Sequence, residues 1–312
     1  MQYPLRAPTA RPVARLAVRG RTVPLGVRTL VMGILNVSPD SFSGDGLADV
    51  TGALRQAEDF LRAGADILDV GAMSTRPGAA IIAEDAEAER LRNVIAALRT
   101  LTDLPISADT LRLEPARAAL DVGADILNDI SGLRDPRLAQ LAASYGTGVV
   151  VMHMQGTPET MQRNPQYTDV VGEVYDFLAT GVKTAQDAGV SENGIIVDPG
   201  IGFGKTLDHN IELLHRLTEF TGLGHALLVG TSRKAFIGRI TGREVGERAA
   251  GTAATVALAI ARGADIVRVH DVEQMVDVCR VSDRIVRWGS APEVPGESEQ
   301  GVEPPQCRRP HA

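Results

Sequence analysis

The sequence predicts an α/β protein, a (β/α)8 TIM barrel, from three observations. The tetrapeptide Gly-Ala-Asp-Ile begins at Gly64, Gly123 and Gly263, each time after an amphipathic stretch and before a short apolar run. The offsets of 59 and 140 residues correspond to two and then four βα units of about 30–35 residues each. The segment from Leu30 to Trp288 matches the length of about 250 residues that is typical of this barrel.

Composition supports this fold class and excludes some functions. Hydrophobic residues make up 44% of the 312 residues but aromatic residues only 4%, so aliphatic side chains dominate the core. Such side chains suit helices packed on a buried parallel sheet. The net charge of −7 argues against nucleic acid as a partner. The net charge does not exclude an anionic substrate, because a few arginines near the binding site can outweigh the negative charge of the whole chain.

The elements are expected in a simple order along the chain. Residues 1–13 are expected to be a disordered lead, and residues 14–28 alternate apolar and polar side chains around Gly20, which predicts a hairpin that closes the amino-terminal face of the barrel. A single barrel domain, which includes the hairpin, is expected over 14–288. The tail 289–312, rich in Pro, Glu and Gly, is expected to be disordered. The eight predicted strands are 30–36, 66–70, 105–109, 125–128, 148–152, 195–198, 226–230 and 265–269.

Helices are expected between these strands. Val272, Met275, Val276 and Cys279 form an apolar stripe with helical spacing, and Asp271 before them predicts an N-cap. A doubly wound open sheet is the alternative architecture. The sequence carries no GxGxxG motif after its first strand, which disfavours that alternative.

The segment from Gly33 to Gly46, GILNVSPDSFSGDG, is the most informative stretch. Its apolar first half predicts a strand that is buried on both faces, and the Ser, Pro, Asp and Gly residues that follow predict a long polar loop. In a barrel, such a loop at the carboxyl end of a strand faces the substrate.

Polar side chains stand at nearly every predicted strand end, where a barrel places its active site. Carboxylates and an amide could hold the N–H donors of a flat heterocycle, because a carboxylate accepts two such bonds. Arginine, histidine and threonine side chains suit a phosphate or pyrophosphate. The first set is Asp109, Asn128 and Asp198, and the second is Thr75, Arg76, Arg268 and His270; Asn36, Asp69, His153 and Lys234 stand at or just after other strand ends.

Over residues 29–288 the sequence resembles the dihydropteroate synthases. The resemblance rests on ordered motifs: GILNVSPDSFSGDG, GADILDVGAMSTRPG, ADT at 108–110, GADILNDISG, MHMQGTPETMQ, VDPGIGFGK, LLVGTSRKAFIG and GADIVRVHDV. The family joins a dihydropterin diphosphate to p-aminobenzoate, with release of pyrophosphate. The resemblance therefore implies a C–N bond-forming transferase of folate biosynthesis.

The resemblance also implies a role for individual residues. It assigns the pterin to Asp109, Asn128, Asp198, Lys234, Met152 and Phe203. It assigns the pyrophosphate to Thr75, Arg76, Arg268, His270 and Asn36, with Asn36 also holding a magnesium ion, Mg²⁺. It assigns the p-aminobenzoate to Pro39, Phe42, Ser74 and Ser232. Lys234, Arg268 and Asp109 are the expected catalytic residues.

The implied reaction explains the kinds of side chain that are present. A leaving pyrophosphate needs positive charge around it, which Arg76, Arg268, His270 and magnesium are expected to supply. The arylamine is already a nucleophile at neutral pH, so no Ser/His/Asp or Cys/His set is needed.

The sequence departs from the common family pattern at three places: Ser43-Gly44-Asp45-Gly46, Ala72-Met73 and Ala108. The first two put contacts of the loops in doubt more than the pterin pocket. Two other functions are alternatives: a methyltransferase that uses a folate and a corrinoid on the same barrel, and a relative that binds pterins without catalysis. The methyltransferase would not need the SerThrArgProGly loop or Ser232-Arg233-Lys234, because no anion leaves.

Partners and compartment follow from what the sequence lacks. No apolar run has the length of a membrane helix, so no membrane partner is expected. Cys279 and Cys307 form no CxxC, which predicts a reducing compartment, the cytoplasm. A transit peptide is the alternative for the Arg-rich start, although Pro4, Pro8 and Pro12 disfavour the amphipathic helix that it needs. The resemblance implies small-molecule substrates and a homodimer, with 271–287 as a candidate interface helix.

Overall fold

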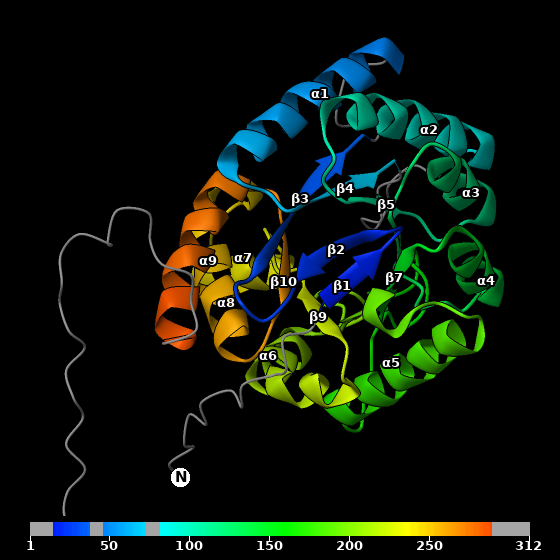
Figure 1. Cartoon of the computed structure of the whole chain (residues 1–312). Coiled ribbons are helices and arrows are strands. Elements are labelled where there is room, and N and C mark those ends of the chain that lie inside the picture. The colour runs from blue at the N-terminus through cyan, green and yellow to red at the C-terminus, as the bar shows by residue number, and fades with distance from the viewer. Residues whose placement is uncertain (1–14, 38–45, 73–81, 289–312) are drawn as a thin grey trace, which may run out of the picture.

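A computed structural model describes residues 15–37, 46–72 and 82–288. Within these ranges eight parallel strands close into a barrel, in the order β10-β3-β4-β5-β6-β7-β8-β9 (Figure 1). The predicted (β/α)8 barrel is therefore confirmed, and the open sheet is excluded. The strands are β3 (Leu30–Asn36), β4 (Ile67–Gly71), β5 (Ile106–Asp109), β6 (Ile126–Asp129), β7 (Gly148–Met152), β8 (Ile195–Asp198), β9 (Ala226–Val229) and β10 (Ile266–Val269).

Helices surround the barrel on the outside (Figure 1). Their order along the chain alternates with the strands, as a parallel sheet requires. They are α1 (Gly46–Ala63), α2 (Glu84–Leu101), α3 (Leu113–Asp121), α4 (Pro136–Tyr145), α5 (Val170–Asp187), α6 (Leu207–His215), α7 (Ala235–Thr241), α8 (Ala249–Ala261) and α9 (Val272–Val286), with short 3-10 turns at Glu192–Gly194, Leu217–Leu223 and Val245–Glu247. None of the helices in the described ranges is long and apolar enough to cross a membrane.

The aliphatic side chains of each strand divide between two cores. Val31 and Leu35 on β3 point outward and pack in the layer between the barrel and its helices. Leu30 and Met32 on the same strand point inward and pack near the amino-terminal end of the barrel. This alternation follows from the two-residue period of a strand and explains why the strands read as continuous apolar runs.

The repeated Gly-Ala-Asp-Ile unit has the same structure in each copy. Its glycine ends a helix at positive φ, which glycine adopts without strain. Its aspartate carboxylate then accepts a hydrogen bond from a backbone N–H at the start of the neighbouring strand. These bonds run from Val31 N to Asp66, from Ile106 N to Asp125 and from Leu227 N to Asp265, each at 2.9 Å.

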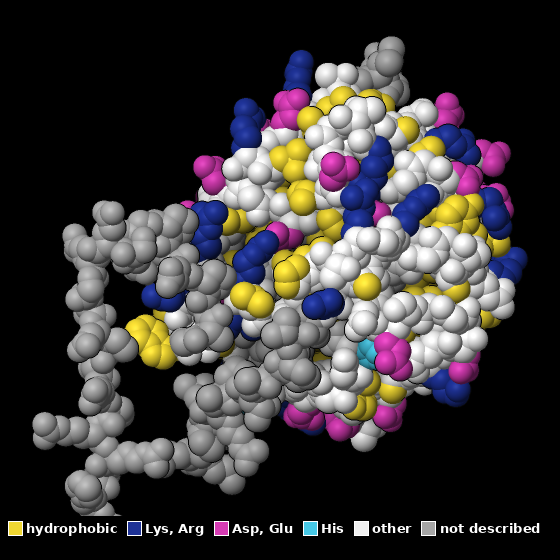
Figure 2. All heavy atoms as spheres, viewed as in Figure 1, with side chains coloured by type: hydrophobic (Ala, Val, Ile, Leu, Met, Phe, Trp, Pro, Cys, Tyr) yellow, Lys and Arg dark blue, Asp and Glu magenta, His cyan; other side chains and the backbone are white. Residues whose placement is uncertain are grey.

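A hairpin covers the amino-terminal end of the barrel, as predicted. Strands β1 (Arg15–Val18) and β2 (Arg21–Pro24) pair antiparallel and lie across the ring of strands (Figure 1). Arg19 and Gly20 form the turn at positive φ. Leu16 and Val18 are fully buried in the inner core. Figure 2 shows this face as spheres, with Lys and Arg side chains spread among apolar ones.

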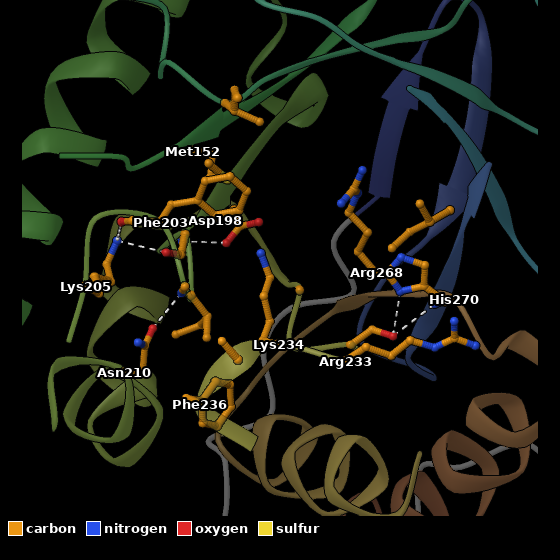
Figure 3. A pocket seen from close by; sticks show the side chains of 18 of the residues that line it. Met152, Asp198, Phe203, Lys205, Asn210, Arg233, Lys234, Phe236, Arg268 and His270 are labelled. Carbon is orange, nitrogen blue, oxygen red and sulfur yellow. Dashed lines mark hydrogen bonds between the residues drawn. The ribbon is translucent and has the colours of Figure 1, made fainter. Parts of the chain in front are cut away.

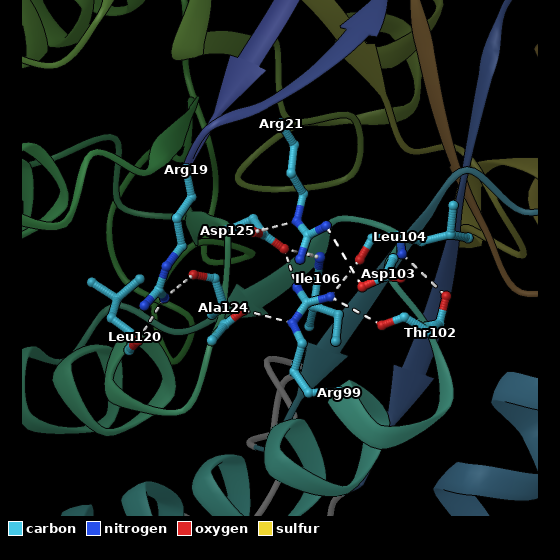
Figure 4. A network of polar contacts seen from close by, with 11 residues as sticks. Arg19, Arg21, Arg99, Thr102, Asp103, Leu104, Ile106, Leu120, Ala124 and Asp125 are labelled. Atoms are coloured by element: carbon cyan, nitrogen blue, oxygen red, sulfur yellow. Dashed lines mark hydrogen bonds and ion pairs between the residues drawn. The ribbon is translucent and has the colours of Figure 1, made fainter.

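Charged groups join the hairpin to the barrel (Figure 4). Asp125 is 1% exposed and accepts from Arg21 at 3.1 Å and from Arg99. Arg99 also donates to the carbonyl oxygen of Leu104 at 2.7 Å. Arg19 donates to the carbonyl oxygens of Leu120 and Ala124. The buried carboxylate is therefore paired and hydrogen-bonded, as a buried charge must be.

Two local predictions need correction. Several strands begin one residue later than predicted, immediately after the aspartate of the repeat. Asp271 stands at the N-cap of α9, but its side chain caps no backbone N–H. It accepts instead from the guanidinium of Arg233, a charged donor that outcompetes a backbone amide. The predicted lead 1–13 and tail 289–312 lie outside the described residues.

Candidate active site

A cavity of about 540 Å³ opens at the carboxyl ends of the strands. Its wall includes the last residues of several strands, among them Asn36, Asp109, Met152 and Asp198. The long side chain of Arg268 reaches it from β10. This is the end at which (β/α)8 barrels place their active sites.

Arg268 joins three strands across this cavity. Its Nε donates to Asp69 at 2.7 Å and its Nη2 to Asp109 at 2.6 Å. Asp69 is fully buried and also accepts from the side-chain amide of Asn128 at 3.2 Å. Two carboxylates on one guanidinium fix its orientation more tightly than a single pair would. Burial raises the pKa of Asp109, although the charge of Arg268 opposes the rise.

Asp198 stands at the end of β8, and one of its carboxylate oxygens is already hydrogen-bonded within the protein. Its Oδ1 accepts from the backbone N–H of Gly200 at 2.7 Å, and its carboxylate faces the cavity (Figure 3). Burial raises the pKa of Asp198 to about 6, against the hydrogen bond from Gly200 and the charges of Lys234, Arg268 and Lys205. At neutral pH it is a carboxylate that can accept further N–H donors.

An aromatic ring and an ammonium group lie beside Asp198 in the cavity wall (Figure 3). Lys234 Nζ lies 3.9 Å from the centre of the Phe203 ring, within cation–π distance. Phe203 packs against an apolar cluster that contains Ile130, Met152 and Met161. A flat ring and a thioether near a carboxylate suit a planar heterocycle with polar edges.

Ser232 and His270 both line this cavity and are in contact. Ser232 Oγ accepts from the backbone N–H of His270 at 3.1 Å and lies 3.0 Å from its Nδ1. Burial, together with the charge of Arg268, lowers the pKa of His270 to about 4. The imidazole is therefore neutral at pH 7. This applies to the protein without a bound anion, so the expectation that His270 contributes positive charge to pyrophosphate stays a prediction; the neutral imidazole can donate one hydrogen bond.

Comparison with known proteins agrees with this geometry. The model of the pterin binding enzyme family matches residues 32–270. A dihydropteroate synthase of Synechocystis sp. is 49% identical over 265 residues, which cover 84% of this chain and 92% of that protein. The chain belongs to the dihydropteroate synthase family.

Further relatives of that family extend the likeness. The dihydropteroate synthase of Escherichia coli is 44% identical over 80% of this chain and 89% of its own length. The structure of the Yersinia pestis enzyme with a sulfonamide drug superimposes with a TM-score of 0.81 at 38% identity, over 87% of this chain and 98% of that one. The Xanthomonas albilineans enzyme with 4-aminobenzoic acid gives a TM-score of 0.81 at 41% identity, over 88% and 98%.

The structure gathers around one cavity the described residues to which the family resemblance assigned roles. They are Asn36, Asp109, Asn128, Met152, Asp198, Phe203, Ser232, Lys234, Arg268 and His270. Pro39, Phe42, Ser74, Thr75 and Arg76 lie outside the described residues, so their predicted contacts stay predictions. Of the departures from the family pattern, Ala108 is buried in the layer between strands and helices, so it affects packing and not the cavity.

Two side chains of the site, Asp69 and Lys205, had received no binding or catalytic role from the sequence. Asp69 was expected near a strand end and lies in the middle of β4; its position was the available signal, but its partner Arg268 lies 199 residues away. Lys205 ends the VDPGIGFGK motif and reads in sequence as a surface lysine. It is 4% exposed, belongs to the wall of the cavity, and contacts His153 and two carbonyl oxygens.

Proposed function

We propose that this chain joins 6-hydroxymethyl-7,8-dihydropterin diphosphate to p-aminobenzoate, giving 7,8-dihydropteroate and pyrophosphate. One observation carries the proposal: Asp109, Asn128 and Asp198 line the same cavity as Lys234 and Arg268. Hydrogen-bond acceptors for a heterocycle thus adjoin cations for an anionic leaving group. The likeness to family members solved with 4-aminobenzoic acid and in the presence of pteroic acid supports the same pair of substrates.

The acidic side of the cavity would hold the pterin. Asp198 has an oxygen that is not bonded to Gly200, and it can accept from the amino and ring N–H groups of a pterin. Phe203 and Met152 would contact the faces of the ring. Lys234 lies over Phe203 in the free protein, so a pterin that stacks there would displace the ammonium toward the ring edge. Two carboxylates also stabilise positive charge that develops on the pterin as pyrophosphate departs.

The leaving group would be held on the other side. Arg268 is a cation beside His270, and Arg233 and Lys234 line the same cavity. Thr75 and Arg76 are the further residues expected there. Arg268 is held by Asp69 and Asp109 in the free protein. It would share its N–H groups between these carboxylates and the diphosphate, and neutral His270 would donate one hydrogen bond.

Magnesium is the proposed metal, with Asn36 as its protein ligand. Asn36 ends β3 and lines the cavity with its side-chain amide, an oxygen donor of the kind that magnesium accepts. The described residues contain no group of three His, Cys, Asp or Glu side chains that could hold a metal alone. That fits an ion that takes most of its ligands from phosphate and water. When bound, it would neutralise charge on the departing pyrophosphate.

The second substrate needs little chemical activation. The nitrogen of p-aminobenzoate is uncharged near neutral pH, so it attacks without a base. Ser232, held by His270, would be the described part of its pocket. Pro39, Phe42 and Ser74 are the expected remainder.

A homodimer in the cytoplasm is the proposed assembly. Helices α8 and α9 pack side by side and leave large apolar side chains exposed: Leu258 is 54% exposed, Val281 62% and Ile285 70%. Adjacent exposed apolar side chains of this kind favour association. Cys279, the cysteine in the described ranges, is a buried free thiol, which suits a reducing compartment.

The experiment is an assay of pyrophosphate release by the purified chain. Release should require the pterin diphosphate, p-aminobenzoate and magnesium together, and the product should contain both organic substrates. Release without incorporation of the arylamine would refute the proposed reaction. Pterin binding without any turnover would instead favour the non-catalytic relative, and methyl transfer from a folate would favour the methyltransferase.

A further inference from the structure

Lys205 is a buried cation in the wall of the cavity that contains the proposed pterin pocket. Its side chain is almost fully enclosed, which is rare for lysine. Its Nζ lies 2.9 Å from three acceptors: the carbonyl oxygens of Gly200 and Phe203, and Nδ1 of His153. An ammonium has three N–H donors, and here each has an acceptor. The match in number favours a charged lysine beside a neutral histidine that accepts at Nδ1.

These contacts hold the backbone of the loop 199–206, which leads from β8 to α6. Gly200 adopts φ +67°, and a Cβ there would overlap the carbonyl oxygen of His153. Gly202 donates to Asn210 at 2.6 Å, and Tyr167 donates to the carbonyl oxygen of Gly204 at 2.7 Å. The loop is therefore folded tightly around the ammonium, with glycines where side chains do not fit.

The loop connects the ammonium to two groups of the pocket. Gly200 donates its N–H to Asp198 and accepts from Lys205 with its carbonyl oxygen. Phe203 accepts from Lys205 with its own carbonyl oxygen and presents its ring to the cavity. The position of Lys205 is thus linked, through one residue each, to the carboxylate and to the aromatic face.

We propose that Lys205, with His153 as its acceptor, is a positioning residue for the pterin. It fixes Gly200 and Phe203 so that the Asp198 carboxylate and the Phe203 ring face the heterocycle together. The inference deepens the proposed function and rests on it. Neither Lys205 nor His153 needs to touch the substrate for this role.

The charge of Lys205 also acts on Asp198. The charges that act on Asp198 are those of Lys234 at the start of α7, Arg268 on β10 and Lys205 in its own loop. Asp109 of β5 lines the same cavity, and His153, which follows β7, contacts Lys205. Burial and the charge of Lys205 lower the pKa of His153 to about 2, so His153 adds no charge. Burial also lowers the pKa of Lys205 itself, and Asp198 opposes this. Removal of the ammonium should therefore raise the pKa of Asp198.

The test compares four variants by titration calorimetry with a pterin between pH 5 and 9, and with pyrophosphate as a second ligand. Lys205→Met removes the ammonium at similar volume. His153→Leu removes the acceptor, whereas His153→Asn keeps an oxygen at the place of Nδ1. Lys183→Met is the matched control, because Lys183 is an exposed lysine of α5 paired with Asp187.

We expect Lys205→Met to weaken pterin binding about tenfold or more, and to move the pH midpoint of binding upward by about one unit. Pyrophosphate affinity should stay within about twofold, because its site is on the other side of the cavity. His153→Asn should recover most of the pterin affinity that His153→Leu loses. Lys183→Met should match the unmodified chain.

Unchanged pterin affinity and an unchanged pH midpoint in Lys205→Met would overturn the inference. So would a weakening equal at every pH, together with equal losses in His153→Asn and His153→Leu, because that is the signature of a loosened fold alone. If Lys205→Met does not fold, the two His153 variants test the inference: equal pterin affinity of His153→Asn and His153→Leu would overturn it. A chain whose unmodified form binds no pterin would refute the proposed function instead, so the two failures are distinguishable.

Discussion

Asp198 illustrates what a single carboxylate contributes to the cavity. One oxygen orients the loop through Gly200, and the other remains for a ligand. Asp198→Asn replaces an acceptor by a donor against the N–H groups of the pterin. We expect pterin binding to weaken by about 1–3 kcal/mol, the usual cost of an unsatisfied buried polar group. Calorimetry with a pterin measures this, and equal affinity in both proteins would place Asp198 outside the binding site.

The same carboxylate predicts a dependence on pH. Because the pKa of Asp198 is raised to about 6, protonation competes with pterin binding as the pH falls below that value. Affinity should be constant well above pH 6 and fall about tenfold per unit below it. Asp198→Asn should lack the part of this dependence that belongs to Asp198. A pterin affinity that does not change between pH 8 and 5 would contradict the prediction.

The sequence predicted which residues line the cavity better than it predicted which of their side chains contact one another. Strand ends and family motifs led to Asp109, Asn128 and Lys234, which do line the cavity. The links among side chains could not be predicted, because Asp69 and Arg268 are far apart in sequence and meet only when the barrel closes. The neutral state of His270 likewise depends on burial, which no motif expresses.

Among the elements, the aspartate of the Gly-Ala-Asp-Ile repeat makes the same contact three times. Each copy bonds the first part of a neighbouring strand at the amino-terminal end, far from the cavity. Residues at that end of a barrel serve stability. The repeat was predicted to mark βα units, and it does, but the hydrogen bond of its carboxylate was not predicted, since at least one helix separates the aspartate from its partner strand.

Asp125→Asn should therefore destabilise the fold without touching the site. The amide would present N–H groups to Arg99 and to the backbone N–H of Ile106, which both donate to Asp125. Breaking a buried pair costs about 3–5 kcal/mol, and we expect the lower end because an amide oxygen remains. Urea unfolding measures this. Asp59→Asn, in an exposed pair with Arg62, is the control and should leave stability nearly unchanged. Equal stability of both variants would show that the network contributes little.

For the whole molecule, the sequence alone was sufficient to predict the barrel architecture. Three repeats and eight apolar runs defined a barrel, because the spacing of βα units depends on local structure alone. Which outer face associates could not be predicted in this way, since helices such as α9 carry an apolar stripe for the core and a second, shorter set of exposed apolar residues.

The proposed homodimer gives a prediction for that second set. Ile285→Lys places a charge among exposed apolar side chains of α9 and should shift the chain toward the monomer. Sedimentation at several concentrations measures the shift. Lys183→Glu on α5, an exposed position on a helix that packs against α4 and α6, is the control and should leave association unchanged. A monomeric unmodified chain, or a dimer that persists in Ile285→Lys, would show that this face of α9 is not a dimer interface.

The last helix returns to the beginning of the barrel. Asp283 accepts from the backbone N–H and the hydroxyl of Thr29, at 2.7 and 2.8 Å, and Arg287 donates to the carbonyl oxygen of Gly26 at 3.0 Å. The end of α9 and the entry to β3 are therefore neighbours, although more than 250 residues separate them in the chain. A closed ring has no natural first strand. The same barrel is thus compatible with circular permutation, in which a linker joins the end of α9 to the hairpin that precedes β3 and new termini open in a loop elsewhere.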